Sequence, residues 1–134
     1  MKTINTNKLG EIGLFGENAA VDYLSELGYE IIARNVICDS HEIDIIVSDM
    51  RYIVFVEVKT RTVYKGNSIY GKPAAAVNKA KQTAIIGAAK SFLKTNRHRK
   101  LPRFDVIEVY VDKKDGILSI NKINHIPRAF GTRK

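Results

Sequence analysis

The chain has 134 residues, which is long enough for one domain with a single buried core. Apolar residues make up 45% and charged residues 27%, a composition typical of globular proteins. No apolar run approaches the roughly 20 residues of a membrane-spanning helix, and the polar N-terminus lacks the apolar core of a signal peptide. The single cysteine, Cys38, excludes an internal disulfide and a multi-cysteine zinc site. We therefore expect one cytoplasmic domain over residues 1–134, with no membrane partner.

The charge of the chain indicates the class of its partner. Lysine and arginine number 22 against 14 acidic residues, so the net charge is +8 and the pI is near 9.6. A basic surface attracts polyanions, and contacts to phosphates release counterions. Charge therefore favours a nucleic-acid partner, but it does not separate DNA from RNA, or either of them from an acidic protein surface.

The hydrophobic pattern predicts two helices and five strands in the order α-β-β-β-α-β-β. Gly28 ends the first helix, and Lys114-Asp115-Gly116 is a hairpin turn signal between the last two strands. The predicted helices cover residues 9–28 and 75–93, and the predicted strands cover 29–36, 42–48, 52–60, 103–112 and 117–126. We expect a loop over 61–73 and a basic tail over about 127–134. This order predicts an α/β fold with a mixed sheet flanked by helices.

Three charged residues of the second and third predicted strands can share one face of a hairpin. Side chains alternate along a strand, so Glu57 and Lys59 point the same way. A loop formed by residues 49–50 would pair Ser48 with Arg51 and Asp44 with Phe55. Asp44 and Glu57 then become diagonal neighbours, with backbones about 7–8 Å apart. A slip of one residue would place them on opposite faces.

A pair of buried carboxylates is typical of a site for a divalent cation. Asp44 and Glu57 lie in strands that otherwise look buried, and unpaired buried carboxylates are costly. Oxygen ligands without histidine or cysteine suit Mg²⁺ or Mn²⁺. The alternative is a solvent-facing sheet surface on which Glu57 and Lys59 simply alternate with valines.

The two predicted helices each direct polar residues toward this hairpin. Glu17 lies on the apolar stripe of the first helix, where it can supply a third oxygen ligand; the alternative is a first-turn glutamate that complements the helix dipole. Lys81 falls inside the apolar stripe of the second helix, with Gln82 beside it. Lys81 can meet a phosphate or a carboxylate, or its stem can lie along apolar surface with the charge in water.

Basic and aromatic residues alternate in the segment between the third strand and the second helix. Basic side chains can contact phosphates, and tyrosines can stack on exposed bases. The candidate nucleic-acid-binding residues are Arg61, Tyr64, Lys65, Tyr70, Lys72, Lys79 and Lys81. The basic segment 97–100 and the C-terminal basic residues are typical of a solvated surface.

Several strings of residues together resemble a known family. Asp44 followed by Glu57-Val58-Lys59 looks like the Asp…Glu-x-Lys signature of the restriction-endonuclease-like PD-(D/E)xK nucleases. The likeness extends over nearly the whole chain to the bacterial YraN-like family and, more distantly, to archaeal Holliday-junction resolvases. The strings that carry it are GENAA (16–20), YL (23–24), GY (28–29), RN (34–35), EIDII (42–46), VFVEVKTR (54–61) and RFDV (103–106). One departure is His41, where the YraN-like pattern usually has glycine.

The resemblance implies a restriction-endonuclease-like fold and a role for each matching residue. Asp44 and Glu57 would bind the metal with the backbone carbonyl of Val58. Lys59 would orient the attacking water and stabilise charge on the phosphate. Glu17 corresponds to the helix glutamate of such enzymes, and Lys81-Gln82 stand where related enzymes carry accessory active-site residues.

These observations predict a metal-dependent nuclease that hydrolyses phosphodiester bonds in DNA, with branched or processed DNA as candidate substrates. The expected cofactor is Mg²⁺ or Mn²⁺, which can activate water and neutralise charge. The alternatives are a DNA-binding or recombination-associated accessory protein with little or no cleavage activity, and a protein that acts on RNA. One domain carries one site, so paired cuts would require a symmetric homodimer.

Overall fold

The computed structural model describes residues 6–63 and 77–131 and contains two helices and five strands in the predicted order. The helices are α1 (Thr6–Glu26) and α2 (Lys79–Thr95). The strands are β1 (Glu30–Cys38), β2 (His41–Ser48), β3 (Tyr52–Val63), β4 (Leu101–Lys114) and β5 (Ile117–Phe130). The predicted order α-β-β-β-α-β-β is therefore confirmed.

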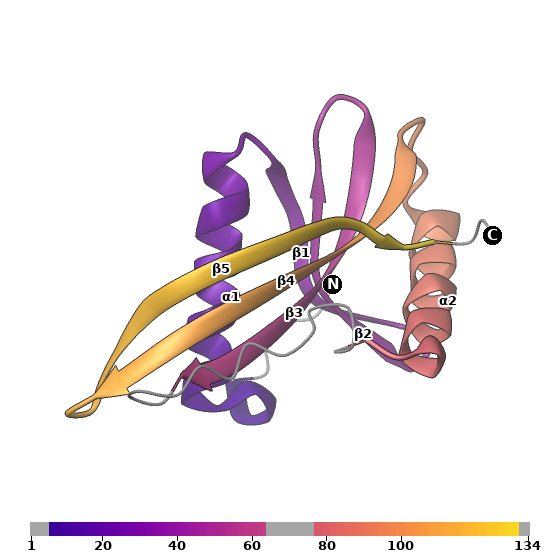
Figure 1. The fold of residues 1–134 in the computed structure, drawn as a ribbon. Helices are drawn as coiled ribbons and strands as arrows, with labels where there is room; N and C mark the ends of the chain where they lie inside the picture. The colour runs from indigo at the N-terminus through magenta and orange to yellow at the C-terminus, as the bar shows by residue number, and fades with distance from the viewer. Residues whose placement is uncertain (1–5, 64–76, 132–134) are drawn as a thin grey trace.

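The five strands form one mixed sheet in the spatial order β1-β2-β3-β4-β5 (Figure 1). Neighbouring strands run antiparallel except for β3 and β4, which are parallel. A parallel pair needs a crossover connection, and α2 lies within that connection. Tyr52 of β3 faces Leu101 of β4, and the pairing continues to Val63 and Asp112.

Each face of the sheet carries its own hydrophobic core. On one face Phe55 packs edge-on against Phe92 of α2, with ring centroids 6.1 Å apart, and stacks on Phe104 at 5.5 Å. On the other face Leu24 of α1 packs in a cluster with Val54 and other strand residues. Figure 1 shows the two helices on either side of the strands. The alternative of a solvent-facing surface is therefore wrong for the part of β3 that contains Glu57.

The element boundaries differ from the predicted ones where polar contacts decide them. The second helix was predicted to begin at residue 75, but α2 begins at Lys79. Asn78 is its N-cap, because the Asn78 side chain accepts the N–H of Lys81. In α1 the backbone leaves helical geometry at Gly10, which has a φ of 67°. β3 continues to Val63 into the predicted loop, and β5 continues to Phe130 into the predicted tail.

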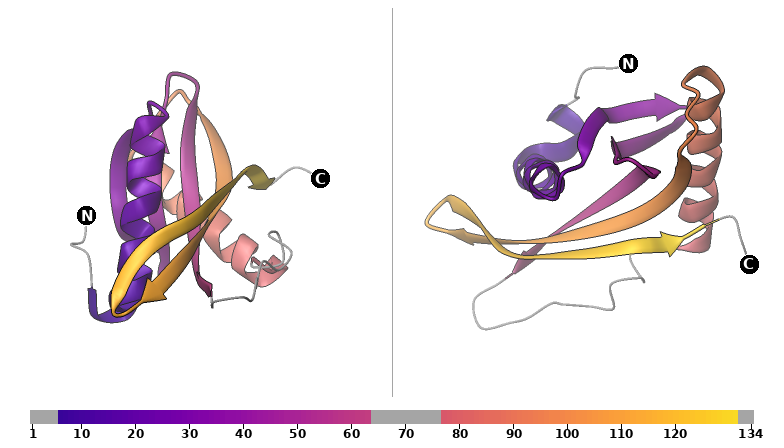
Figure 2. Two further views of the ribbon diagram at one scale, coloured as in Figure 1. Left: turned by 60° about the vertical axis from the view of Figure 1, so that its left-hand side comes forward. Right: turned by 90° about the horizontal axis from the view of Figure 1, so that it is seen from above.

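The β4–β5 hairpin is the longest feature of the fold. Asp115 and Gly116 both adopt positive φ angles, 52° and 77°, as a tight hairpin turn requires. The turn signal was therefore predicted correctly. Figure 2 shows the hairpin curving and projecting past α1, with its tip at the far end from α2.

A buried polar network ties β4 to β5 and α1. Asp105 is fully buried and accepts hydrogen bonds from Arg103 at 2.8 and 2.9 Å. His125 of β5 lies 2.7 Å from the same carboxylate through Nε2 and 3.0 Å from the Tyr23 hydroxyl of α1 through Nδ1. Arg103 also donates to the Tyr29 hydroxyl at 2.7 Å. Through Tyr23, this network fixes α1 to strand β5 of the sheet.

Neither described helix is both long enough and apolar enough to cross a membrane.

Candidate active site

The β2–β3 hairpin has a register two residues away from the predicted one. Ser48 faces Ile53 and Ile46 faces Phe55, whereas a two-residue loop would have paired Ser48 with Arg51. The turn is longer because the Asp49 side chain accepts the N–H groups of Arg51 and Tyr52. A shift of two residues preserves the alternation of side chains. Asp44 therefore still lies close to Glu57, although it does not face Phe55.

The β2–β3 pairing ends just before the candidate site. The last paired residues are Ile45 and Val56, although β3 continues to Val63. Beyond that pair the Asp44 carboxylate accepts the backbone N–H of Val58 at 2.8 Å. The side chain of one strand thus takes the place of a backbone acceptor on the other, which satisfies the Val58 N–H and holds Asp44 beside Glu57.

A pocket of about 290 Å³ forms where the two strands separate. Acidic side chains from α1, β2 and β3 line it together with backbone and small residues. Its lining consists of Gly13, Glu17, Asp44, Glu57, Val58 and Thr60. Four of these residues were predicted as metal ligands, and the structure brings all four to one pocket.

The helix α1 approaches β3 closely at this pocket because Gly16 has no side chain. A Cβ atom at this position would lie 2.1 Å from Oγ1 of Thr60, far inside van der Waals contact. Glu17 follows Gly16 directly and is only 2% exposed. The close approach therefore carries a glutamate from the helix to the edge of the hairpin site.

The carboxylates of the pocket repel one another. Burial raises the pKa of Asp44 well above its usual range, and the charge of Glu57 raises it further. The hydrogen bond from Val58 opposes these effects without overcoming them. Glu57 itself is 6% exposed. The ionised form of Asp44 beside Glu57 would be stabilised by a cation lying between the two carboxylates.

Two lysines supply positive charge beside Glu57. The Nζ atom of Lys59 lies 3.5 Å from Oε2 of Glu57, and the Nζ atom of Lys81 lies 3.7 Å from the same oxygen. Lys59 comes from the same strand and Lys81 from the first turn of α2. Of the two readings of Lys81, the structure supports the one in which its charge points toward the acidic cluster.

Glu17 is held by two residues of β1 that the sequence did not assign to the site. Its Oε1 atom accepts bonds from Arg34 at 2.8 and 3.2 Å and from Asn35 at 2.8 Å. Asn35 has a φ of 52°, in the left-handed region, and its side chain reaches α1 from this position. Glu17 lies seven residues after the break at Gly10, which excludes the first-turn dipole role. The sequence did contain one signal for these two residues, since Arg34-Asn35 is among the strings that resemble the family.

The other predicted site residues do not all converge on the pocket. Gln82 binds the segment before α2, because its Nε2 donates to the carbonyl of Val77 at 3.0 Å. Lys79 is exposed at the start of α2. Arg61 lies 3.4 Å from the fully buried Glu108 of β4. The remaining candidates, Tyr64, Lys65, Tyr70 and Lys72, lie outside the described residues.

The donor set of the pocket fits a hard divalent cation, but with few protein ligands. The oxygens of Asp44 and Glu57 and the carbonyl of Val58 are of the type that Mg²⁺ and Mn²⁺ prefer. Within residues 6–63 and 77–131, no group of three His, Cys, Asp or Glu side chains has the spacing of a metal site. Glu17 lines the same pocket, where its Oε1 atom is already bound by Arg34 and Asn35.

A larger cavity, of about 540 Å³, lies elsewhere, between β1 and α2. Ile32, Val36, Cys38 and Phe92 are among the residues that line it. Burial raises the pKa of the Cys38 thiol, which disfavours the reactive thiolate. Its lining lacks the paired carboxylates of the smaller pocket, so we place the candidate chemistry in the smaller one.

Comparison with known proteins places the chain in a family. The family described as "Uncharacterised protein family UPF0102" matches residues 16–109. A UPF0102 protein of Caldicellulosiruptor bescii is 44% identical over 117 residues, which cover 86% of this chain and 95% of the relative. One of Caldanaerobacter subterraneus subsp. tengcongensis is 40% identical over 131 residues, covering 97% and 100%. One of Clostridium botulinum is 44% identical over 117 residues, covering 86% and 92%. The chain therefore belongs to the UPF0102 family, the YraN-like family that its motifs resemble.

Proposed function

We propose that this protein is a metal-dependent nuclease that hydrolyses phosphodiester bonds in DNA. The observation that carries the proposal is the pairing of Asp44 with Glu57 in one pocket, with the ammonium groups of Lys59 and Lys81 within 4 Å of Glu57. Phosphodiester hydrolysis needs a positioned water and charge neutralisation at the phosphate. Both requirements match the groups that line this pocket.

Asp44, Glu57 and the carbonyl of Val58 would hold Mg²⁺ or Mn²⁺. A bound ion of this kind polarises a phosphate oxygen and lowers the pKa of water. Lys59 places a fixed positive charge next to Glu57, where it stabilises the charge that develops on the phosphate. Lys81 brings a second positive charge from α2 to the same carboxylate oxygen. Glu17 fixes the edge of the pocket through Arg34.

DNA is the favoured substrate class because the net charge of +8 suits a polyanion and the motifs resemble nucleases that act on DNA. RNA carries the same phosphodiester group, so the cleavage assay described below includes an RNA substrate. Cleavage of both strands of a duplex would need two copies of the single pocket, which a symmetric homodimer supplies.

The second candidate function is a DNA-binding or recombination-associated accessory protein with little or no cleavage. One observation favours it: the described part of the chain contains no three-residue acidic or histidine group at metal-binding spacing. In this reading the lysines contact the backbone and the buried carboxylates maintain the separation of β2 from β3.

A cleavage assay separates the two functions. The purified protein is incubated with Mg²⁺ or Mn²⁺ and labelled duplex, single-stranded, flap, four-way-junction and RNA substrates. We expect cleavage of a DNA substrate that requires the cation and is lost in Asp44→Asn and Lys59→Met. Asp22→Asn, which removes an exposed carboxylate of α1, is the matched control and should cut like the parent.

A second readout does not depend on turnover. Mn²⁺ should raise the thermal unfolding midpoint of the parent and of Asp22→Asn, because a ligand that binds the folded state stabilises it. It should raise that of Asp44→Asn much less. Binding of DNA without cleavage and without a Mn²⁺ effect would overturn the nuclease proposal in favour of the accessory protein. Cleavage by Asp44→Asn at the parent's rate would overturn the site.

A further inference from the structure

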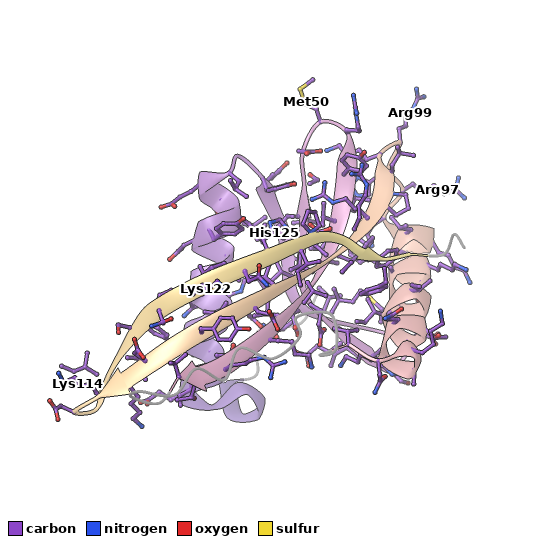
Figure 3. All side chains as sticks on the ribbon, viewed as in Figure 1. Met50, Arg97, Arg99, Lys114, Lys122 and His125 are labelled. Carbon is purple, nitrogen blue, oxygen red and sulfur yellow. The ribbon has the colours of Figure 1, made fainter. Side chains whose placement is uncertain are left out.

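Cationic side chains gather at the end of the sheet where β3 begins. The turn before β3 and the loop before β4 lie side by side, since the N–H of Leu101 donates to the carbonyl of Arg51 at 3.0 Å. Arg128 of β5 joins them because its guanidinium lies over the ring of Tyr52, 5.1 Å from the centroid. We call this surface the basic tip; it consists of Arg51, Arg97, Arg99, Lys100 and Arg128. Figure 3 shows Arg97 and Arg99 pointing away from the body on the α2 side of this end, with Met50 at the tip of the β2–β3 hairpin.

The backbone of the basic tip is held in place by its own hydrogen bonds. The Asp49 carboxylate accepts the N–H of Arg51 at 2.9 Å and that of Tyr52 at 2.7 Å. The Lys100 ammonium donates to the Ser48 hydroxyl at 3.2 Å, which fastens the second loop to the first. The cations are therefore presented by an ordered surface, which lowers the conformational entropy lost on binding.

Within the part of the chain that the structure describes, the arginines of the basic tip form no ion pair with an acidic residue. Throughout residues 6–63 and 77–131, Arg51, Arg97, Arg99 and Lys100 take part in no ion pair. Arg97 and Arg99 are also exposed. Like charges placed together repel one another, and a polyanion relieves this repulsion. A pocket of about 310 Å³ is lined by Lys100 together with Glu30 and Asp49, so Lys100 has acidic neighbours and the exposed arginines carry the test.

One residue of the basic tip, Arg51, directly precedes β3, the strand that carries Glu57. Arg51 comes six residues before Glu57 (57 − 51 = 6), which is about 20 Å along a strand at roughly 3.3 Å per residue. That length corresponds to about six nucleotide steps of roughly 3.4 Å. We propose that the basic tip binds the phosphate backbone of a nucleic acid at a distance from its cleavage point. The inference rests on the proposed nuclease site for the identity of the polymer.

A paired set of charge-removing variants tests the basic tip. Arg97→Gln/Arg99→Gln removes two charges from the tip, and Lys113→Gln/Lys114→Gln removes two from the far end of the β4–β5 hairpin, where Figure 3 shows Lys114. Both double variants have the same net charge. Binding to a fluorescein-labelled duplex is measured in EDTA as KCl rises from about 50 to about 300 mM.

We expect the arginine variant to bind more weakly, with a salt slope of log Kd reduced by about two, because each lost phosphate contact contributes roughly 0.9. The lysine variant should keep the parent's slope. Equal losses in both variants would mean that only net charge matters, and an unchanged arginine variant would exclude the contact. Either result overturns the inference, as does binding of the parent to vesicles of anionic phospholipid but not to the duplex.

The same variants keep this inference distinct from the proposed function. A parent that binds the duplex through the arginines but cuts nothing with Mn²⁺ would support the basic tip and overturn the nuclease. A parent that cuts, with both double variants equally affected, would support the nuclease and overturn the basic tip. The substituted arginines are exposed, so the fold, checked by circular dichroism, should be retained.

Discussion

The Asp44 carboxylate accepts the backbone N–H of Val58 at 2.8 Å, just past the last β2–β3 pair. This bond keeps the carboxylate at the mouth of the pocket although burial and the charge of Glu57 raise its pKa. The folded protein therefore binds the Asp44 proton more tightly than the unfolded chain does. Above the ordinary aspartate pKa of 3.8, the ionised side chain lowers the stability of the fold.

We predict that Asp44→Asn makes the metal-free protein more stable at neutral pH. Asparagine retains an acceptor oxygen for Val58 but carries no charge. Urea unfolding in EDTA should give a higher midpoint for Asp44→Asn than for the parent, whereas Asp22→Asn should leave the midpoint unchanged. A lower midpoint for Asp44→Asn would mean that the carboxylate stabilises the fold and is not under electrostatic strain.

The two lysines beside Glu57 should differ in their effects on cleavage. Lys59 lies two residues after Glu57 on β3, and its Nζ is 3.5 Å from the carboxylate. We expect Lys59→Met to lower kcat by about 10²–10³-fold, the usual cost of removing one charge-stabilising group. Lys81→Met should mainly raise KM, because this lysine approaches from α2 and is 42% exposed. Steady-state cleavage of one DNA substrate by both variants measures kcat and KM. A KM effect in Lys59→Met and a kcat effect in Lys81→Met would contradict the roles given to the two lysines.

The shared face of the hairpin was predictable from sequence, but its register was not. Alternation alone places Asp44 and Glu57 together for any register shifted by an even number of residues. The actual shift depends on the Asp49 side chain, which extends the turn by accepting two backbone N–H groups. Local patterns do not specify whether a turn aspartate makes such bonds or faces water.

The partners of Glu17 illustrate a second limit of sequence reasoning. Helical spacing correctly directed Glu17 toward the sheet, because periodicity reports which side of a helix is buried. It could not report what Glu17 meets there. Arg34 and Asn35 reach it from β1, where Asn35 has a left-handed backbone conformation and the strand pairing shifts between Ile31 and Ala33. Such bulges arise from packing between distant segments.

The Glu17–Arg34 pair should be strongly coupled. Glu17 is 2% exposed, so removal of Arg34 leaves a buried carboxylate with only Asn35 and no opposite charge. We predict that Arg34→Ala lowers the free energy of unfolding by about 3 kcal/mol. Adding Glu17→Gln to Arg34→Ala should recover part of this loss. Urea unfolding of both single variants and the double variant gives the coupling energy, and additive losses would show that the pair is not the source of the stability.

The approach of α1 to the pocket should depend on Gly16. The Cβ of an alanine there would meet Oγ1 of Thr60 at 2.1 Å, so we expect Gly16→Ala to destabilise the fold by about 1–3 kcal/mol through overpacking. Gly87 of α2 is the matched control, because among the described residues no atom beyond its own stretch of helix lies within 4 Å of its added Cβ. Gly87→Ala should stabilise the fold by roughly 0.5–1 kcal/mol, since alanine favours a helix. Adding Thr60→Ala to Gly16→Ala should recover stability; no recovery would place the strain elsewhere.

The Asp105 network should make the fold sensitive to acid. Burial by itself raises the pKa of Asp105, but the hydrogen bonds from His125 and Arg103 and from the N–H of Arg128 outweigh it, so the pKa lies below the ordinary 3.8. An aspartate with a lowered pKa stabilises the fold fully above its ordinary pKa. That stabilisation is lost as the pH falls below 3.8 toward the pKa of the folded state.

We predict that Asp105→Asn is less stable than the parent near pH 6, by about 3 kcal/mol, because Arg103 then lacks its buried partner. The difference should shrink as the pH falls below 3.8, the ordinary aspartate pKa, because the unfolded parent then binds a proton at Asp105 more readily than the folded parent does. Urea unfolding of both proteins across this range measures it, with Asp22→Asn as a control that should follow the parent throughout. A difference that stays constant down to low pH would mean that the carboxylate acts through its shape and hydrogen bonds, and that its charge contributes nothing to the stability of this side of the sheet.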